Sequence, residues 1–414
     1  MLRTFRKTRL VVFVLLLCLL SSSATLAAVR ADSSGVKSAY LSHYFGIDIS
    51  RPITAGEYAE YLLKLQPQGS TLSIEPADAP RPLAMPDAIK YAVIGANMEE
   101  LALVYTDEKI AASLSKAGVS GVPAGYSAYV ACALDLGMLD AETVTAGAEA
   151  DANSIISLLM AVADMNGVSR NYAGYTDDPG IIAEVINRWK SFTLFDDEKL
   201  SAIGADVVTR KLTTGFSLKS GKHDARFLPE LTLIYGHDDI KHAAQILSLL
   251  KSEGVSAKVQ VEPKVSIYQY MPEWGEPSAP TPTYEVRKVR DGLMLVYATE
   301  YDLVLEFENP EDMKAINGLI MAYAKKNSGE EGKRLLHGSW WQPLYYARSE
   351  MGEGYRKIYD NAAENGDYSL HSLSMAAGGA KLLMALSEEP GLKVSQSPVW
   401  ADLPFYRYLN GESE

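Results

Sequence analysis

Apolar residues recur every three or four positions through the first part of the chain, from about residue 36 to 165. This spacing places them on one face of an α-helix, and Gly or Asn stands near the end of most stretches, where helices commonly stop. The clearest stretches are TAGEYAEYLLKLQ (54–66), PDAIKYAVIGAN (86–97), TDEKIAASLSKAG (106–118), GYSAYVACALDLGML (125–139) and DANSIISLLMAVADM (151–165). We therefore expect an all-helical domain over residues 32–170.

The helix that follows Thr54 carries a complete start motif. Thr54 and Glu57 are three residues apart, which is the spacing of a capping box. In such a box the Thr hydroxyl accepts a hydrogen bond from a first-turn amide, and the Glu carboxylate accepts one from the cap amide. Tyr58, Leu62 and Leu65 follow at spacings of three and four, so they should share one buried face.

The pattern changes after a predicted helical connector at 171–227, whose two helices read DPGIIAEVINRWKSF (178–192) and DDEKLSAIGADVVTRKL (196–212). Residues 228–330 show β-rich stretches in which apolar and polar residues alternate, separated by amphipathic helices. In order these are a strand at 230–236, a helix at 237–255, a strand at 256–263, three strands at 284–289, 293–300 and 303–309, and a helix at 310–326. This order predicts a ferredoxin-like α+β sandwich.

The last part of the chain, residues 331–414, continues the mixture of strands and helices. We expect strands within WWQPLYYARSEM (340–351) and DYSLHSLSM (367–375), helices at GYRKIYDNAAEN (354–365) and GGAKLLMALSEE (378–389), and an extended piece at LKVSQSPVW (392–400). The predicted fold class is therefore α+β and multidomain, with helical repeats at the N-terminus and ferredoxin-like domains behind them.

The first 31 residues have the composition of a secretory signal peptide. Four basic residues precede the uncharged run LVVFVLLLCLL, and the small residues of SSSATLAAVRA follow it. A positively charged N-terminal region, a short apolar region and a cleavage site of small residues are typical of a secretory signal peptide that is removed. No later run approaches the roughly 18 apolar residues of a membrane-spanning helix, so we expect a secreted protein without a transmembrane segment after cleavage.

The charge balance narrows the classes of partner. The 414-residue chain has 39 Lys and Arg against 52 Asp and Glu, a formal net charge of −13. Five of the basic residues and none of the acidic ones lie in residues 1–31, so cleavage would leave 34 against 52, or −18. Such an acidic chain is repelled by nucleic acid and by anionic lipid, which argues against both as partners.

A resemblance adds to this picture. The end of a first helix is seen in ALDLGML (133–139), and the start of a second helix is seen, in another part of the chain, at Ile53, Thr54 and Glu57. Over about residues 36–168 the chain resembles the S-layer homology (SLH) family, whose repeats consist of a helix, a loop and a second helix. That family uses three helical repeats to attach secreted bacterial proteins to cell-wall polysaccharide. Its Thr-Arg-Ala-Glu motif reads Thr54-Ala55-Gly56-Glu57 here, so the guanidinium that suits carboxylates of the polymer is missing from this motif.

A second resemblance covers residues 230–262. The Ala-rich helix, the Gly turn and the following β-rich strand are similar to the sporulation-related (SPOR) repeat, a small module that binds peptidoglycan glycan strands. Together the two resemblances imply cell-wall polysaccharide or peptidoglycan as the partner and the cell surface of a bacterium of the Gram-positive type as the location.

The cluster YGHDDIKH contains the clearest metal-ligand types. His237, Asp239 and His242 could bring imidazole and carboxylate groups together at the start of a helix. The alternative is that Asp238 or Asp239 caps that helix and complements its dipole. We favour the cap, because no third anchored ligand group is evident, and we expect no metal and no cofactor.

Aromatic residues are the better indication of a binding surface. The chain has 24 Tyr, 9 Phe and 5 Trp. Tyr and Trp offer an apolar face with a polar edge, which suits a sugar ring or a protein partner, although core packing is the competing explanation. The candidates are Trp274, Tyr268, Tyr270, Trp340 and Trp341. Trp274 lies in a Pro-rich loop, which makes it the best candidate for an exposed ring.

These observations predict a secreted, non-catalytic protein of the cell envelope that attaches to wall glycan, or scaffolds there, through the SLH-like module. No Gly-x-Ser-x-Gly motif is present, and we assign no catalytic residue. A glycan hydrolase with carboxylates that the sequence does not locate is one alternative. An interaction module that holds other envelope proteins through its aromatic loops is another.

Overall fold

The computed structural model describes residues 35–144, 149–289, 292–323 and 344–412. Two of the predicted aromatic candidates, Trp340 and Trp341, and the predicted signal peptide at 1–31 lie outside these residues. Among the described residues, none of the helices combines the length and the apolar character needed to cross a membrane.

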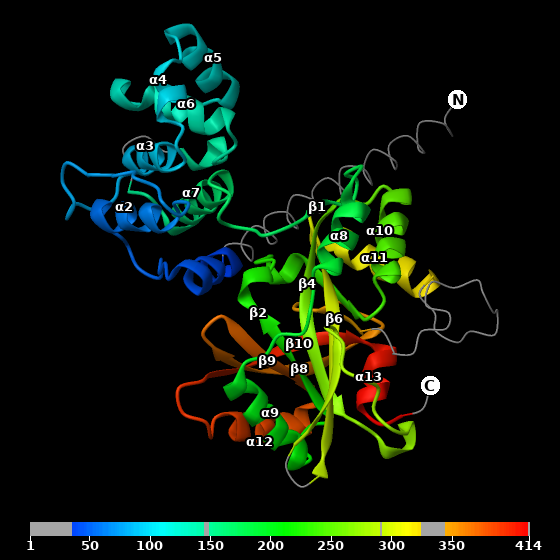
Figure 1. Ribbon diagram of the computed structural model, residues 1–414. Coiled ribbons are helices and arrows are strands. Elements are labelled where there is room, and N and C mark those ends of the chain that lie inside the picture. The colour runs from blue at the N-terminus through cyan, green and yellow to red at the C-terminus, as the bar shows by residue number, and fades with distance from the viewer. Residues whose placement is uncertain (1–34, 145–148, 290–291, 324–343, 413–414) are drawn as a thin grey trace, which may run out of the picture. The chain divides into compact units, whose positions relative to one another are not determined.

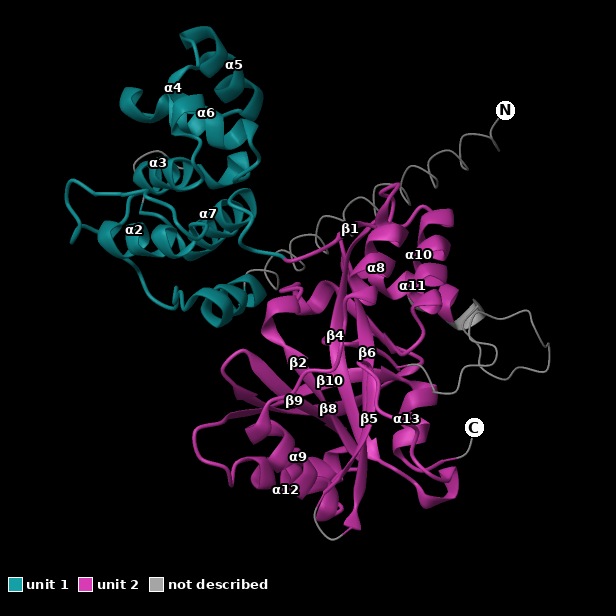
Figure 2. Cartoon of the chain, viewed as in Figure 1, with its two compact units in different colours: residues 1–170 teal, residues 171–414 magenta. Residues whose placement is uncertain are grey.

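The chain divides into two compact units, residues 1–170 and residues 171–414, which Figure 2 colours separately. The domain boundaries predicted near 227 and 330 both fall within the second unit. We describe each unit by itself, as unit 1 and unit 2.

Unit 1 is helical in its described part, and the five helices predicted from apolar spacing are confirmed with small shifts at their ends. Residues 35–45 are also helical. The further elements are α2 (Ala55–Lys64), α3 (Met85–Gly95), α4 (Glu99–Leu103), α5 (Asp107–Ala117), η1 (Ala124–Tyr126), α6 (Ser127–Asp135), η2 (Ala141–Thr143) and α7 (Ala152–Met165).

The predicted capping box at the start of α2 is present. The Thr54 hydroxyl accepts a hydrogen bond from the Glu57 amide at 3.2 Å, and Glu57 Oε2 accepts one from the Thr54 amide at 2.8 Å. Tyr58, Leu62 and Leu65 are fully buried, as their spacing predicted. The local sequence therefore determines both where this helix begins and which face it buries.

Helices α2, α3 and α7 are joined at both ends. At their starts, short extended segments pair, with bridges from Thr54 to Pro82 and from Ala84 to Glu149. At their ends, the Asn166 side chain donates to the carbonyl of Leu65 and to that of Gly95, each at 2.9 Å. These bonds satisfy carbonyl groups that a helix end otherwise leaves unpaired.

Unit 2 is built on a ten-stranded sheet, and Figure 1 shows its long strands β4 and β6. The strands are β1 (Gly174–Tyr175), β2 (Gly215–Ser220), β3 (Thr232–His237), β4 (Ala257–Gln269), β5 (Tyr284–Lys288), β6 (Met294–Phe307), β7 (Leu344–Ala347), β8 (Tyr355–Asn365), β9 (Tyr368–Ser374) and β10 (Lys393–Asp402). Their order is β1-β4-β2-β9-β8-β10-β7-β3-β6-β5, and β4 also pairs with β6. That last pairing closes eight antiparallel strands into a barrel, with β1 and β5 as additions at its wall.

The predicted fold class, helical repeats followed by a ferredoxin-like α+β sandwich, is therefore wrong. The strands predicted at 230–236 and 256–263 exist as β3 and as the first part of β4, but they belong to a sheet that closes on itself. Strands from the C-terminal part of the chain complete the ring between β2 and β3. Alternation along one strand identifies a strand, whereas closure depends on partners far away in the sequence.

One predicted helix, residues 354–365, is instead the strand β8. Tyr355, Ile358 and Ala362 are spaced by three and four residues, which fits a helix as well as an irregular strand. In the structure β8 pairs with β9 on one side and with β10 on the other. This pairing on both sides overrides the local preference.

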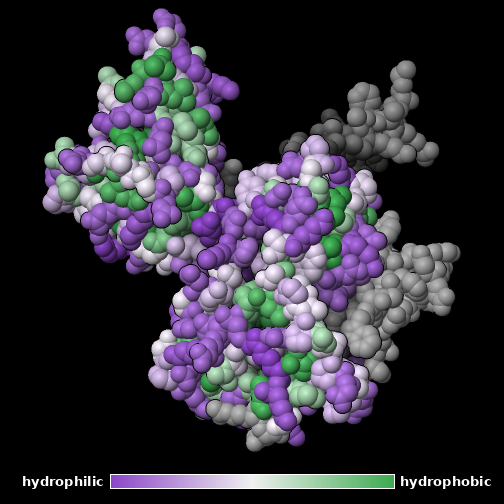
Figure 3. Space-filling view, viewed as in Figure 1, coloured by the Kyte–Doolittle hydropathy of each residue, from purple (hydrophilic) through white to green (hydrophobic). Residues whose placement is uncertain are grey.

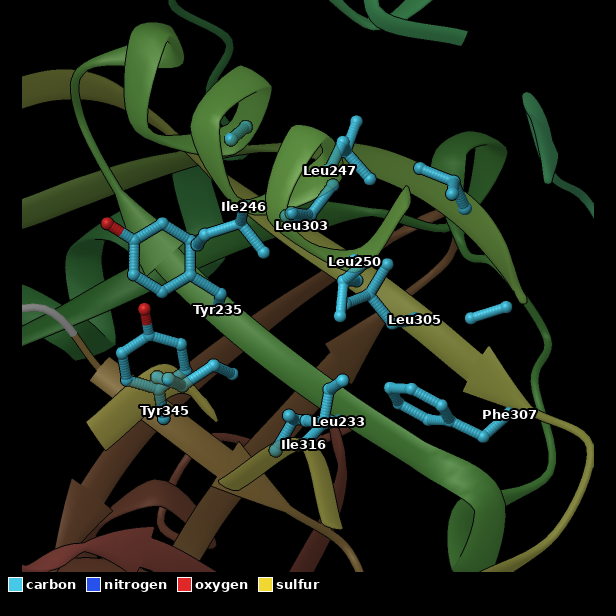
Figure 4. Close-up of a cluster of buried hydrophobic side chains, with 14 of the residues drawn as sticks. Leu233, Tyr235, Ile246, Leu247, Leu250, Leu303, Leu305, Phe307, Ile316 and Tyr345 are labelled. Atoms are coloured by element: carbon cyan, nitrogen blue, oxygen red, sulfur yellow. The ribbon is translucent and has the colours of Figure 1, made fainter. Parts of the chain in front are cut away.

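Helices cover the outside of the barrel. They are α8 (Ile181–Lys190), α9 (Glu198–Thr209), α10 (Ile240–Ser252), α11 (Pro310–Tyr323) and α12 (Ala376–Leu386). The last helix, α13 (Leu403–Leu409), instead packs against apolar residues of the barrel interior. Short turns are η3 (Gly221–His223), η4 (Pro229–Leu231) and η5 (Pro272–Trp274). Figure 1 shows α8, α10 and α11 together over one part of the wall and α9 and α12 over another. Under the first group, Leu233, Leu303 and Leu305 of the wall pack against helix residues such as Leu247 and Ile316 (Figure 4).

Candidate functional site in the barrel interior

The inner faces of β4 and β6 carry charged and polar side chains. Successive side chains of a strand point to opposite faces of the sheet. On β6, Leu303 and Leu305 point outward into the helix-covered core, so Asp302 and Glu306 point into the barrel. Both carboxylates are almost completely buried. Buried carboxylates require charged or hydrogen-bonding partners, and the interior supplies them.

Two lysines from neighbouring strands meet the carboxylate of Asp302. Lys264 Nζ on β4 lies 2.8 Å from Asp302 Oδ1, and Lys219 Nζ on β2 lies 2.5 Å from Oδ2. Gly236 on β3 makes room for this group, because a Cβ there would lie 2.8 Å from Lys264 Nζ and 2.9 Å from Asp302 Oδ1. A glycine inside a strand often marks such a close approach.

Further acceptors surround the two lysines. Glu262 Oε2 lies 3.6 Å from Lys219 Nζ, and Glu300 Oε2 lies 3.7 Å from Lys264 Nζ. Ser266 donates a hydrogen bond of 2.6 Å to Glu300 Oε2. Each lysine therefore faces two carboxylates, and the cluster has three carboxylates for two ammonium groups.

The environment separates the pKa values of these carboxylates. Burial on its own would raise the pKa of Asp302, but the charges of Lys219 and Lys264 outweigh it and hold the pKa well below its ordinary value. Burial would likewise lower the pKa of Lys219, yet Asp302, together with Tyr346 and Glu262, holds it well above the ordinary value. For Glu262 and Glu300 burial dominates and raises the pKa.

A second ionisable pair lies on β8 and β9. Asp360 Oδ2 is 2.8 Å from His371 Nδ1, and His371 Nε2 is 2.9 Å from the Ser369 hydroxyl. Although burial would raise the pKa of Asp360, the neighbouring His371 lowers it. The other oxygen, Asp360 Oδ1, is buried and has no hydrogen-bond partner among the described residues. It is an acceptor that the described part of the protein leaves unused.

One end of the barrel interior is filled. Glu262 accepts a hydrogen bond from the Ala225 amide at 2.8 Å, and Glu306 accepts one from the Leu228 amide at 2.6 Å. These bonds fasten the segment before β3 to the interior. An apolar cluster fills the space beside it; its buried members are Ala225, Phe227, Ile234, Val304, Tyr346, Ile358, Val399 and Ala401.

The rest of the interior holds a cavity of about 250 Å³. Its lining joins the two ionisable groups, since Lys219, Lys264, Glu300, Asp302, Asp360 and His371 all contribute to it. Hydroxyl groups of Ser217, Ser266 and Tyr268 line it as well, and Phe405 and Tyr408 of α13 add aromatic rings. The cavity therefore combines polar groups with an aromatic wall.

Exposed aromatic rings lie next to this cavity. Tyr268 lines it, and the Trp274 ring is 6.4 Å from the Tyr268 ring, between centroids, in an edge-on arrangement. The Trp274 side chain is 44% exposed and that of Tyr408 is 58% exposed. On the face drawn in Figure 3, hydrophobic residues show as separate patches within a largely hydrophilic surface. We call Tyr268, Trp274 and Tyr408 the aromatic rim.

The predicted aromatic candidates thus have different positions. Tyr268 and Trp274 belong to the rim, whereas Tyr270 is buried and donates a hydrogen bond of 3.1 Å to the Gly275 carbonyl. Trp274 also contacts the Tyr270 ring edge-on. The sequence therefore selected a segment near the cavity, but it could not separate the supporting ring from the exposed one.

The histidine cluster forms a buried pair. His237 and His242 are nearly inaccessible, with ring centroids 4.4 Å apart, and His237 lines the cavity. Burial, with the charge of His237, lowers the pKa of His242 to about 4. Asp239 caps α10 by accepting from the Lys241 amide, which confirms the predicted cap. Within the described ranges, no group of three or more His, Cys, Asp or Glu side chains is arranged to hold a metal ion.

The interior charges are the functional candidates that the sequence interpretation missed. Polar residues occupy alternate positions of β4, at Lys258, Gln260, Glu262, Lys264 and Ser266. In an open sheet this pattern indicates a face in water, which is how exposed charges usually occur. The same pattern on a closed barrel indicates a polar interior.

No family model, curated protein or solved structure matches the chain. The resemblances to the SLH and SPOR families stay predictions, as does the expected location at the cell wall.

Proposed function

We propose that unit 2 is a binding module that takes one sugar residue of a glycan into the barrel cavity, without catalysis. The observation that carries this proposal is the combination of a polar cavity, closed at its inner end, with the exposed aromatic rim. Hydroxyl-rich rings need hydrogen-bond partners around their edge and an apolar surface for their face, and Tyr and Trp supply such a surface.

The size of the cavity supports a ligand of this kind. Its volume of about 250 Å³ is below the roughly 300–1,000 Å³ of pockets for drug-sized molecules. One sugar ring is a fitting occupant, and the rest of a glycan would leave the barrel past the aromatic rim. Trp274, outside the cavity, is in position to stack on the next ring.

This proposal keeps the predicted role on cell-wall glycan but places a contact in unit 2. Attachment through the SLH-like motif at Thr54 and Glu57 stays a separate prediction. Glu57 is already occupied there, since it forms an ion pair with Arg51 and accepts the capping hydrogen bond. The alternative role of holding another envelope protein also stays a prediction.

A second candidate is the glycan hydrolase. It is favoured by the opposite pKa shifts of two carboxylates that line one cavity, Glu300 with a raised pKa and Asp360 with a lowered one. Such a difference is what a general acid and an ionised partner require. Release of reducing sugar from purified sacculi, lost in Glu300→Gln, would support hydrolysis over simple binding.

The binding proposal is tested by saturation-transfer NMR of the full chain with N-acetylglucosamine and by cosedimentation with purified cell-wall sacculi. We expect binding in both assays. Trp274→Ala should weaken sedimentation roughly three- to tenfold, which is the contribution of about one aromatic contact, with no change in Tm. A complete lack of binding by the wild-type chain to sugar and to sacculi would refute the proposal.

Two exposed apolar residues supply matched controls. Met271 lies in the same loop as Trp274 and is 41% exposed, and Leu103 of unit 1 is 62% exposed. Met271→Ala and Leu103→Ala should leave binding unchanged, because neither residue belongs to the aromatic rim. If either variant weakened binding as much as Trp274→Ala, the effect would come from general surface hydrophobicity.

A further inference from the structure

We infer that the barrel cavity selects an amine-bearing sugar over a neutral one and rejects an anionic one. This inference rests on the proposed function, and it names the class of ligand from the charges of the lining. Carboxylates outnumber ammonium groups there, and the described lysines are already engaged with protein carboxylates.

The two lysines of the cavity are not free to hold an anion. Lys219 faces Asp302 and Glu262, and Lys264 faces Asp302 and Glu300, at distances between 2.5 and 3.7 Å. A ligand carboxylate or phosphate would have to displace one of these buried groups. It would also approach the remaining carboxylates without a compensating charge, which is costly in a poorly hydrated interior.

One carboxylate, that of Glu300, presents an oxygen to a ligand. Within the described part of the chain, the contacts of Glu300 with Ser266 and Lys264 both use Oε2, which leaves Oε1 to a ligand. Asp360 uses Oδ2 for His371, and its Oδ1, although it has no partner, is buried away from the open part of the cavity. An ammonium group has three donors and no acceptor, so it matches the free oxygen of Glu300 better than a hydroxyl does.

The positive groups near Asp360 do not remove this preference. His371 is paired with Asp360, and Lys219 is paired with Asp302. Arg348 also acts on Asp360 through its charge, but it is exposed and does not line the cavity. Among the carboxylate and ammonium groups of the lining, Glu300, Asp302 and Asp360 stand against Lys219 and Lys264, and the charge of Asp360 is matched by His371. A cationic ligand would pair with Glu300, the carboxylate whose second oxygen is free.

The test is titration calorimetry of the full chain with three sugars that share one ring: glucosamine, glucose and glucuronate. At about pH 6 the amine of glucosamine is protonated, because an amine of this kind titrates well above that pH. We expect glucosamine to bind about tenfold more tightly than glucose, the difference that one charge-assisted hydrogen bond provides. Glucuronate should not bind measurably. Added salt should reduce the preference for glucosamine.

Variants assign the preference to the cavity. Glu300→Gln should bring the affinity for glucosamine close to that for glucose. If Glu300→Gln does not fold, Glu300→Asp tests the same group, because the shorter side chain withdraws the oxygen from the ligand and should also reduce the preference. Glu364→Gln is the matched control, because Glu364 lies on β8 like Asp360 but forms a surface ion pair with Lys393 at 3.0 Å. The control should keep the wild-type preference.

The outcomes separate this inference from the proposed function. If none of the three sugars bound, the function itself would be wrong. If glucose bound as tightly as glucosamine, or if glucuronate bound best, the sugar site would stand and the charge selection would be overturned.

Discussion

Charged residues are used in opposite ways in the two units. In unit 1, Arg51 and Glu57 are six residues apart and pair at the surface, where the Arg51 side chain is 61% exposed. In unit 2, Lys264 and Asp302 are 38 residues apart and pair inside the barrel, where the Asp302 side chain is 2% exposed. The first pair joins two residues that are close together in the sequence. The second pair forms only when the barrel has closed.

The difference shows where charge affects stability. An exposed pair gains little, because water and salt screen it and its side chains lose entropy on pairing. A buried pair gains little in forming but leaves an uncompensated charge when one partner is removed. We therefore expect unit 1 to tolerate changes of charge and unit 2 to resist them.

The largest predicted effect comes from Asp302→Asn, which leaves two buried lysines without their shared carboxylate. We expect the free energy of unfolding to fall by about 3–5 kcal/mol, measured by urea denaturation at neutral pH. Because the pKa of Asp302 is held below its ordinary value of 3.8, this contribution is present above that pH and is lost as the pH falls through the folded-state pKa.

The matched change in unit 1 is Arg51→Ala, for which we expect no resolvable change in the urea midpoint. Equal losses from Asp302→Asn and Arg51→Ala would contradict the distinction between interior and surface charge.

A second prediction concerns Asp402, a buried residue of unit 2 for which burial raises the pKa to about 7. Between pH 3.8 and about 7 the unfolded chain releases this proton while the folded chain keeps it, so stability falls as the pH rises. Asp402→Asn removes this dependence and should stabilise the protein by about 2–4 kcal/mol at pH 8. Asn retains an acceptor for the Tyr345 amide, which donates to Asp402 at 3.3 Å.

The measurement is the difference in unfolding free energy between wild type and Asp402→Asn across pH 4 to 8. A difference that does not change with pH would mean that Asp402 is ionised in the folded protein throughout this range. In that case the carboxylate would have found a partner, and the comparison with Asp302 would weaken.

The smallest predicted effect is Thr54→Ala in unit 1. Loss of the hydroxyl removes one half of the capping box of α2, which should cost about 1 kcal/mol. Thermal unfolding followed by circular dichroism measures it. Thr54→Ser keeps the hydroxyl and should recover most of the loss. A loss of unfolding free energy as large as that from Asp302→Asn would show that the capping box contributes more to the stability of unit 1 than its two hydrogen bonds indicate.

Prediction from the sequence succeeded where the interactions are local. The start of α2 at Thr54, the cap of α10 at Asp239 and the buried face of Tyr58 and Leu62 all follow from residues within one or two turns. It failed at β8, where Tyr355 and Ile358 fit a helix, because two strands from elsewhere determine the structure there. The sequence also pointed to Trp274, because it lies in a long Pro-rich loop, and to Tyr268, because it belongs to the same aromatic segment; a binding role for either residue stays a prediction.

The sequence by itself determined the helices of unit 1, their caps, and the alternation of apolar and polar residues along β4 and β6. The tertiary structure alone decided that the polar side of these strands is an interior, because that depends on β4 pairing with β6 and on strands from the C-terminal part completing the ring. Alternation is a property of one strand, whereas inside and outside are properties of a closed sheet. The cavity, its paired lysines and the free carboxylate oxygen of Glu300 exist only because of that closure.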